Sequence, residues 1–212
     1  SPTVTLTDDA SKLIYFTPRF SGLQFGFSFT PDIGHNGGQA ANDANGDFSN
    51  VFGIGANYVR KVMGVNMTVS TVASFGGHET AGTEDMQIWG VGATFAYNGF
   101  ELGAGYVDHG ETGITTANAA LGQDAGQWWD VGLAYSTGPW AISAGYFYGW
   151  AGNVAGVPDS TTGIISLAGT YNAAPGWDLR SDLNFIDVEA IGRVAGDDND
   201  GFVFVLSSVL TF

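Results

Sequence analysis

The sequence predicts an all-β protein, a transmembrane up-and-down antiparallel β-barrel with about eleven readable strands in a single domain over residues 1–212. Three observations support this prediction. Apolar residues alternate with small or polar ones through most of the chain, and a period of two is the side-chain period of a strand. The connections alternate between short and long, as in an antiparallel meander. Aromatic residues recur at both ends of the apolar faces, where membrane interfaces would lie.

The composition agrees with many strands and excludes several classes of function. The chain has 33 Gly, is 14% aromatic and contains no Cys, which excludes a disulfide scaffold and a thiolate metal site. Its 21 acidic residues face only six basic ones, so the net charge is −15. This balance argues against nucleic acid as a partner, because phosphates need a basic footprint. It also argues against attraction to the surface of anionic lipid.

The first two strands differ in how clearly they alternate. Residues 12–20, KLIYFTPRF, form a strand whose phase is ambiguous. We place outward Ile14, Phe16, Pro18 and Phe20, and inward Tyr15, Thr17 and Arg19. The strand at 23–30 is clear, because Leu and Phe occupy one face while Gln, Gly, Ser and Thr occupy the other. A long loop rich in Gly, Asn and Asp follows.

The remaining chain is predicted to form hairpins with apolar outward faces. The strands are expected at 52–58, 66–75, 89–97, 100–106, 129–135, 140–148, 165–171, 177–185 and 202–212. Short turns include Asn98-Gly99, a strong hairpin signal. Long loops are expected at 76–84, 108–126, 149–160 and 187–200. A helical period is absent, so no helix is predicted.

Aromatic residues on the outward faces predict two bands at the membrane interfaces. Trp89 and Tyr97, for example, are eight residues apart. At ~3.3 Å per residue and a strand tilt near 40°, this spacing corresponds to roughly 20 Å of height. Amphipathic rings prefer such interfaces. The residues assigned to the bands are Trp89, Tyr97, Trp129, Tyr135, Trp140, Tyr148, Trp177, Phe185, Phe204 and Phe212.

Polar and charged residues on the opposite faces predict a wet interior. The pore-lining candidates are Arg19, Asn57, Glu101, Asp130, Asp178, Arg180, Asp182 and Asn184. They could set the ion preference of a pore, or they could form a structural network that never meets solute. Trp128 and Phe147 also point inward, either along a sugar track or packed against the wall.

No enzymatic, cofactor or metal site is predicted with a specific pattern. His35, His78 and His109 belong to separate loops and lack a shared metal spacing. The segment Asp43–Asp47 resembles the start of a calcium loop, but its Gly is misplaced and no Glu follows at the twelfth position. Solvated acids are favoured there. They are also favoured over a cation site at Asp197, Asp198 and Asp200.

Three segments resemble Gram-negative general diffusion porins, particularly those of alphaproteobacteria. They are KLIYFTPRFSGLQFGFSFTPD at 12–32, NVFGIGANYVRK at 50–61 and the final LTF, and YFTPRFSG at 15–22 is the most specific. The resemblance implies a sixteen-stranded homotrimeric barrel in the outer membrane, surrounded by lipid and lipopolysaccharide. It further implies passive diffusion of small hydrophilic solutes, and assembly by the barrel assembly machinery through the last strand. The acidic balance predicts a mild preference for cations.

The strand count departs from the family pattern. Single-chain bacterial barrels have an even number of strands and periplasmic termini, and eleven strands satisfy neither condition. We therefore expect the chain to be the C-terminal two thirds of a porin, without the N-terminal strands and the constriction loop. The first alternative is a twelve-stranded barrel with Pro2–Thr7 as the extra strand. Others are a plugged barrel with a structural or adhesive role and a soluble β-sandwich binding protein.

Overall fold

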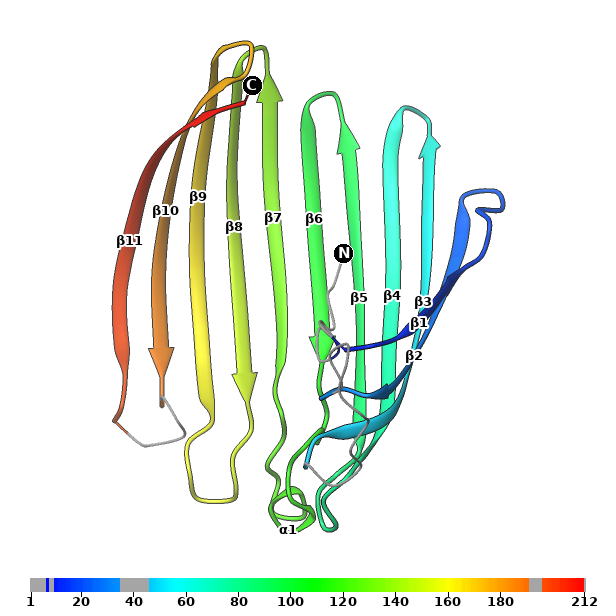
Figure 1. Ribbon diagram of the computed structural model, residues 1–212. Coiled ribbons are helices and arrows are strands. Elements are labelled where there is room, and N and C mark those ends of the chain that lie inside the picture. The colour runs from blue at the N-terminus through cyan, green and yellow to red at the C-terminus, as the bar shows by residue number, and fades with distance from the viewer. Residues whose placement is uncertain (1–6, 8–9, 35–45, 191–195, 212) are drawn as a thin grey trace.

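A computed structural model describes residues 7, 10–34, 46–190 and 196–211. These residues form a single sheet of eleven strands, each paired with its neighbours in chain order (Figure 1). Every pairing is antiparallel. The predicted all-β meander is confirmed. The alternative of a β-sandwich is wrong for the described residues, because a sandwich needs two sheets packed face to face.

Ten of the eleven strands are long enough to cross the apolar layer of a membrane, which takes about 9–11 tilted residues. They have 9 to 15 residues, whereas the first has four. The strands are β1 (Leu13–Phe16), β2 (Leu23–Asp32), β3 (Phe48–Val62), β4 (Val65–His78), β5 (Met86–Tyr97), β6 (Phe100–Asp108), β7 (Gln127–Thr137), β8 (Trp140–Ala151), β9 (Ser160–Ala174), β10 (Trp177–Glu189) and β11 (Asn199–Leu210).

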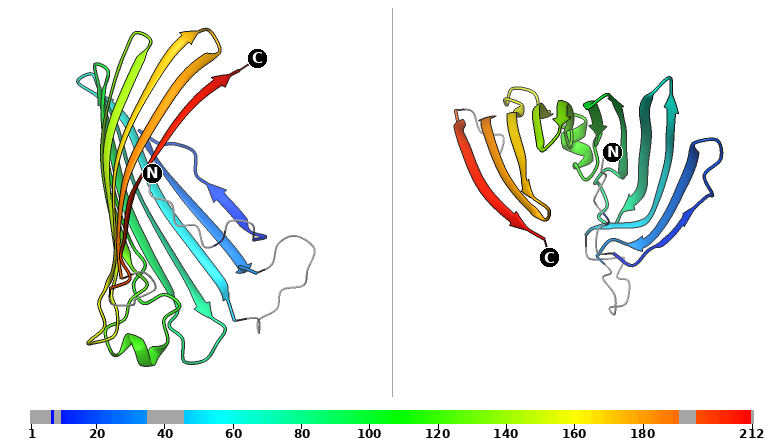
Figure 2. Two further views of the ribbon diagram at one scale, coloured as in Figure 1. Left: turned by 90° about the vertical axis from the view of Figure 1, so that its left-hand side faces the viewer. Right: turned by 90° about the horizontal axis from the view of Figure 1, so that it is seen from above.

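The sheet curls into an open arc with β1 and β11 at its two ends (Figure 2, right). Among the described residues, β1 pairs only with β2, and β11 only with β10. The short turns lie at one rim of the sheet, at the top of Figure 1, and the longer connections lie at the other. The proposed extra strand at Pro2–Thr7 falls outside the described residues except for Thr7.

The two faces of the sheet carry different side chains. Rows of directly paired residues across β2–β5 show this difference: Phe27, Ile54, Ala73 and Trp89 form one row, and Ser28, Gly53, Ser74 and Ile88 form the next. We call the first the outer face and the second, on the concave side, the inner face. The predicted phase is confirmed from β2 to β11.

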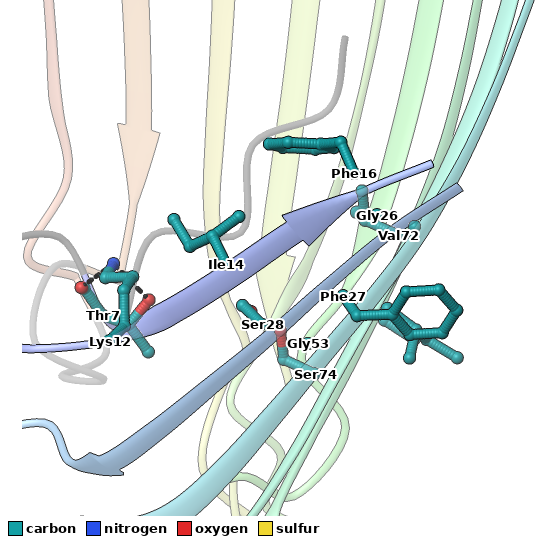
Figure 3. A pocket seen from close by; sticks show the side chains of 13 residues that line it. Thr7, Lys12, Ile14, Phe16, Gly26, Phe27, Ser28, Gly53, Val72 and Ser74 are labelled. Carbon is teal, nitrogen blue, oxygen red and sulfur yellow. Dashed lines mark hydrogen bonds between the residues drawn. The ribbon is translucent and has the colours of Figure 1, made fainter. Parts of the chain in front are cut away.

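The predicted phase of the first strand is wrong. Ile14 and Phe16 lie on the inner face (Figure 3). Tyr15 pairs with Phe27 and so lies on the outer face. The sequence LIYF is apolar in both phases, so alternation carries no information there. Phe16 pairs with Gly26, where an added Cβ would lie 2.8 Å from Phe16 Cε1. Because Gly26 has no side chain, the Phe16 ring can lie over it.

The connection between β6 and β7 also differs from the prediction, because it contains one turn of helix. This helix is α1 (Thr116–Ala119), and the Thr115 side chain caps it by accepting a hydrogen bond from the Asn118 backbone N–H. Four residues are too few to give a helical period in the sequence. Within the described residues, no helix has the length and apolar character needed to cross a membrane.

The inner face is apolar near the long-loop rim, which the prediction of a polar inner face missed. A buried cluster forms there, with Ile33 and Trp128 packed against it: Phe48, Val51, Met86, Ile88 and Val107. The loops brace this region, since the Gln87 backbone N–H donates to Thr112 Oγ1 at 3.0 Å.

Tight turns close the opposite rim, and the one at Asn98-Gly99 gives a test of its packing. Both residues have positive φ, 50° and 86°, and a Cβ on Gly99 would lie 2.5 Å from the Ser136 carbonyl oxygen. We expect Gly99→Ala to lower the free energy of unfolding by about 1–3 kcal/mol, because the backbone is strained and the next hairpin must move. Urea unfolding measures this loss.

The matched control is Gly138→Ala, at a turn whose φ is 55° and where no atom lies within 4 Å of the added Cβ. This variant has the backbone strain without the collision. Equal losses in the two variants would show that contact with Ser136 contributes nothing.

Candidate functional site: the inner wall of the sheet

Paired glycine residues, which we call the glycine floor, form the surface in the middle of the inner face. Gly103, Gly132 and Gly145 stand in one paired row across β6, β7 and β8. A hollow of about 310 Å³ lies over this floor. Its polar lining consists of Thr94, Glu101, Asp130 and Ser143. Because glycine has no side chain, the wall is thin at these positions and the neighbouring carboxylates project beyond it.

Asp130 lines the long-loop end of the hollow, and two aromatic rings lie next to it, beyond the lining. Asp130 pairs with Phe147, and the ring centroids of Phe147 and Trp128 are 5.9 Å apart. Asp130 Oδ1 and Trp128 Cζ3 both lean over Gly105, where an added Cβ would lie 2.6 and 3.6 Å from them. Asp130 is partly buried, and its carboxylate has no hydrogen bond or ion pair with any other described residue.

Two further carboxylates of the wall also lack a partner within the described part of the chain. Glu101 stands at the short-turn end of the hollow, opposite Ala134, and Asp182 lies on β10. The sequence contains no Lys or Arg between Lys61 and Arg180. This sector of the wall therefore carries negative charge that nothing described on it neutralises.

Arg19 lies near the short-turn rim, and three hydrogen bonds hold its side chain. It donates to the Gly22 carbonyl oxygen at 2.6 Å, to Gln24 Oε1 at 2.9 Å and to Asn57 Oδ1 at 2.7 Å. Gln24 and Asn57 pair across β2 and β3 on the inner face. The predicted pore-lining residues Arg19 and Asn57 are thus brought together, in a network that fixes both.

Arg180 forms a second fixed group at the same rim. Its guanidinium lies 2.8 Å from Asp178 Oδ2, and the Asn172 amide donates to Asp178 Oδ1 at 2.9 Å. Asn184 lies further along β10 with its Oδ1 accepting from Ser166 Oγ at 2.6 Å. All eight predicted pore-lining side chains lie on the inner side. Five of them are hydrogen-bonded, namely Arg19, Asn57, Asp178, Arg180 and Asn184, whereas the side chains of Glu101, Asp130 and Asp182 have no partner among the described residues.

A second hollow, of about 270 Å³, lies against β1 (Figure 3). Ile14 and Phe16 line it from β1, and small residues such as Gly53 line it from the neighbouring strands. Lys12 also lines it, but its ammonium group donates to the Thr7 hydroxyl and carbonyl oxygens. This cation is therefore held locally and does not reach the carboxylates of the middle sector.

Aromatic residues of the outer face gather near both rims. The predicted band residues near the short turns are Tyr97, Tyr135, Trp140 and Trp177, and those nearer the long loops are Trp89, Trp129, Tyr148 and Phe185. Many are well exposed, as with Tyr97 at 59% and Trp140 at 56%. This is the placement expected of rings at membrane interfaces.

The last strand shifts the band by two residues from its predicted place. Phe202, which the sequence did not single out, pairs with Phe185, and their ring centroids are 6.4 Å apart. Phe204 pairs with Leu183, closer to the middle of the sheet. Phe212 lies outside the described residues. The register of the last hairpin, rather than a fixed spacing of eight, sets which ring joins the band.

Three carboxylates meet near the long-loop rim. Oxygens of Asp32, Asp47 and Glu79 all lie within 4.8 Å of one another, and Asp32 is only 1% exposed. Asp47 was a calcium candidate, whereas the other two were missed because they come from distant segments. Asp43 lies outside the described residues. Carboxylates this close repel one another unless a proton or cation lies between them.

The other metal candidates stay apart. Asp198 Oδ1 accepts from the Ala190 backbone N–H at 3.0 Å, while Asp197 and Asp200 are exposed. His78 packs edge-on against Phe48, and His109 Nδ1 lies 3.1 Å from the Gly126 carbonyl oxygen. In the described ranges neither set forms a metal-ligating group, and His35 falls outside them.

Residues 2–190 match the family model for Gram-negative porins. The chain belongs to this family. A search of curated proteins found no match. Because it belongs to the Gram-negative porins, the protein resides in the outer membrane of a Gram-negative bacterium, with its apolar and aromatic outer face toward lipid.

Solved structures of outer-membrane channels share the fold. OccAB4 of Acinetobacter baumannii is 12% identical over 94% of this chain and 52% of its own, with a TM-score of 0.64. An anion-selective porin from Comamonas acidovorans is 16% identical over 93% of this chain and 59% of its own, with a TM-score of 0.63. The channel DcaP of A. baumannii is 10% identical over 94% of this chain and 62% of its own, with a TM-score of 0.59. The chain spans between half and two thirds of these relatives, and identities this low show the fold alone.

Proposed function

We propose that this porin forms a water-filled channel of the general diffusion type, the alphaproteobacterial form that its sequence resembles. Small hydrophilic solutes and ions pass through it passively, with a mild preference for cations. One observation carries the proposal: a single curved sheet has an apolar outer face and a glycine-floored inner face with three unpaired carboxylates. Such a wall suits water on one side and lipid on the other.

The proposed channel needs strands beyond the eleven described, whichever polypeptide supplies them. Among the described residues, β1 and β11 each leave one edge without a paired strand, and each unsatisfied backbone group in hydrocarbon costs several kcal/mol. The sixteen-stranded homotrimer implied by the sequence resemblance is the arrangement we propose. Contacts with lipopolysaccharide and delivery by the barrel assembly machinery belong to the same proposal.

Conductance of the native protein tests this function. We expect the purified protein in a planar lipid bilayer with 1 M KCl to insert with ohmic, stepwise conductance, because a closed barrel with this wall holds water along its length. Closure in three equal steps would support the trimer. Heat-unfolded protein in the same detergent is the control.

A plugged barrel with a structural or adhesive role is the second candidate. The buried apolar cluster around Ile88 and Val107 favours it, because this cluster fills part of the inner face at the long-loop rim. Folded, β-rich protein that inserts into lipid without conducting would support this candidate and contradict the open channel.

A further inference from the structure

We propose that the long-loop edge of this hollow, at Asp130 and the two rings beside it, is a binding subsite for organic ammonium cations. Asp130 receives the positive charge, and Trp128 and Phe147 contact the alkyl groups around it. The subsite deepens the proposed function and rests on it, because the hollow lies on the wall of the proposed channel. Permeating amines would then pause at this point of the wall.

The first argument is the charge of Asp130. This carboxylate is partly buried beside two aromatic rings, and no other described residue hydrogen-bonds or pairs with it. A carboxylate partly removed from water is stabilised by a cation at short range. Arg180, the first basic residue after Lys61, is already 2.8 Å from Asp178. A cation that enters the channel can therefore bind at the Asp130 carboxylate.

The second argument is the geometry of the rings. Trp128 and Phe147 have centroids 5.9 Å apart and planes inclined by 34°. Trp128 packs against the buried apolar cluster, which fixes its orientation. An ammonium group is attracted to the face of an aromatic ring, most strongly to Trp. The rings and the carboxylate together provide the two contacts that such a cation combines.

The third argument is the shape and lining of the hollow. A Cβ on Gly149 would lie 3.3 Å from Phe147 Cζ, so the Phe147 ring lies against the wall on the long-loop side of Asp130 and does not cover the hollow. The polar side chains of the lining are two hydroxyls and two carboxylates. They offer no amide or basic donor for the acceptor oxygens of a neutral sugar. Glu101 lies about 13 Å from Asp130 along the strands, since roughly four residues separate their levels, and it extends the negative field.

Block of the channel by tetramethylammonium tests the subsite. We expect this cation to reduce the K⁺ current of the native porin at 0.1 M KCl in a saturable manner, and glucose to leave it unchanged. Asp130→Asn should weaken the block about tenfold, as expected when a charge-assisted contact is lost. Phe147→Leu should weaken it about threefold through loss of a cation–π contact, and it keeps an apolar side chain beside Trp128.

The matched control is Asp182→Asn, which removes one unpaired carboxylate of the same wall away from the rings. Equal weakening by the two Asn variants would overturn the subsite in favour of a diffuse field. A block by glucose that survives Asp130→Asn would overturn it in favour of a sugar site. A conducting channel that tetramethylammonium never blocks would refute the subsite alone.

A protein that does not conduct would refute the proposed channel, and the subsite would then be tested by binding. The tryptophan fluorescence of the folded native porin in detergent should change saturably on addition of tetramethylammonium. This change should be lost in Asp130→Asn and kept in Asp182→Asn. Absence of any saturable change in the native porin would overturn the subsite.

Discussion

Leu133→Arg is expected to destabilise the porin in lipid by about 2–4 kcal/mol, the cost of Arg near the bilayer midplane on the outside of a barrel. Leu133 lies in the middle of β7 on the outer face and is 50% exposed. In a membrane its surroundings are hydrocarbon, where a guanidinium group loses its hydration. Urea unfolding of the protein folded into lipid vesicles measures the loss.

The next residue supplies the matched control. Ala134 points to the inner face and pairs with Glu101, so Ala134→Arg places the same charge in water beside a carboxylate. We expect this variant to stay within about 1 kcal/mol of the native porin, as surface changes usually do. Leu133→Ala separates the loss of the leucine side chain from the added charge. Equal destabilisation by both Arg variants would contradict the assignment of the two faces.

Alternation along the sequence predicted most of the sheet because the two faces of ten strands differ in polarity. In β2, for example, Phe25 and Phe27 face outward while Gly26 and Ser28 face inward, so only one phase is consistent. The segment LIYF of β1 has no such contrast, and its phase was predicted wrongly. The choice is made by a long-range fit, the Phe16 ring over Gly26, which alternation cannot show.

The candidate site was predictable in its residue types but not in its groupings. Glu101 and Asp130 were expected on the inner face, whereas the glycine floor between them depends on the register of three hairpins. The buried apolar cluster left a signal that was overlooked, because Met86 and Ile88 occupy inward positions of β5. The meeting of Asp32 with Glu79 left none, since a search for a calcium loop reads contiguous residues.

Ion selectivity is the second property on which a large effect is expected. In a tenfold KCl gradient, the reversal potential of the native porin should show a preference for K⁺. The unpaired carboxylates of the wall attract cations, whereas Arg180 is paired with Asp178. Arg19 keeps its charge, because its partners are neutral, but it is one cation against three carboxylates. The fold does not fix this sign, because a porin of similar fold is anion-selective. The preference should fade as the Debye length falls from about 10 Å at 0.1 M salt to about 3 Å at 1 M.

Two double variants locate the charges that set this preference. The pair Glu101→Gln and Asp182→Asn removes two carboxylates from the inner face, and we expect it to bring the K⁺/Cl⁻ permeability ratio close to one. Asp187→Asn with Asp200→Asn removes the same charge from the outer face, where these residues oppose each other at the long-loop rim. At 0.1 M salt, charges separated from the pore by more than a Debye length are screened, so this pair should leave the ratio unchanged. A native preference for Cl⁻, or equal shifts from both pairs, would mean that the unpaired carboxylates of the wall do not control selectivity.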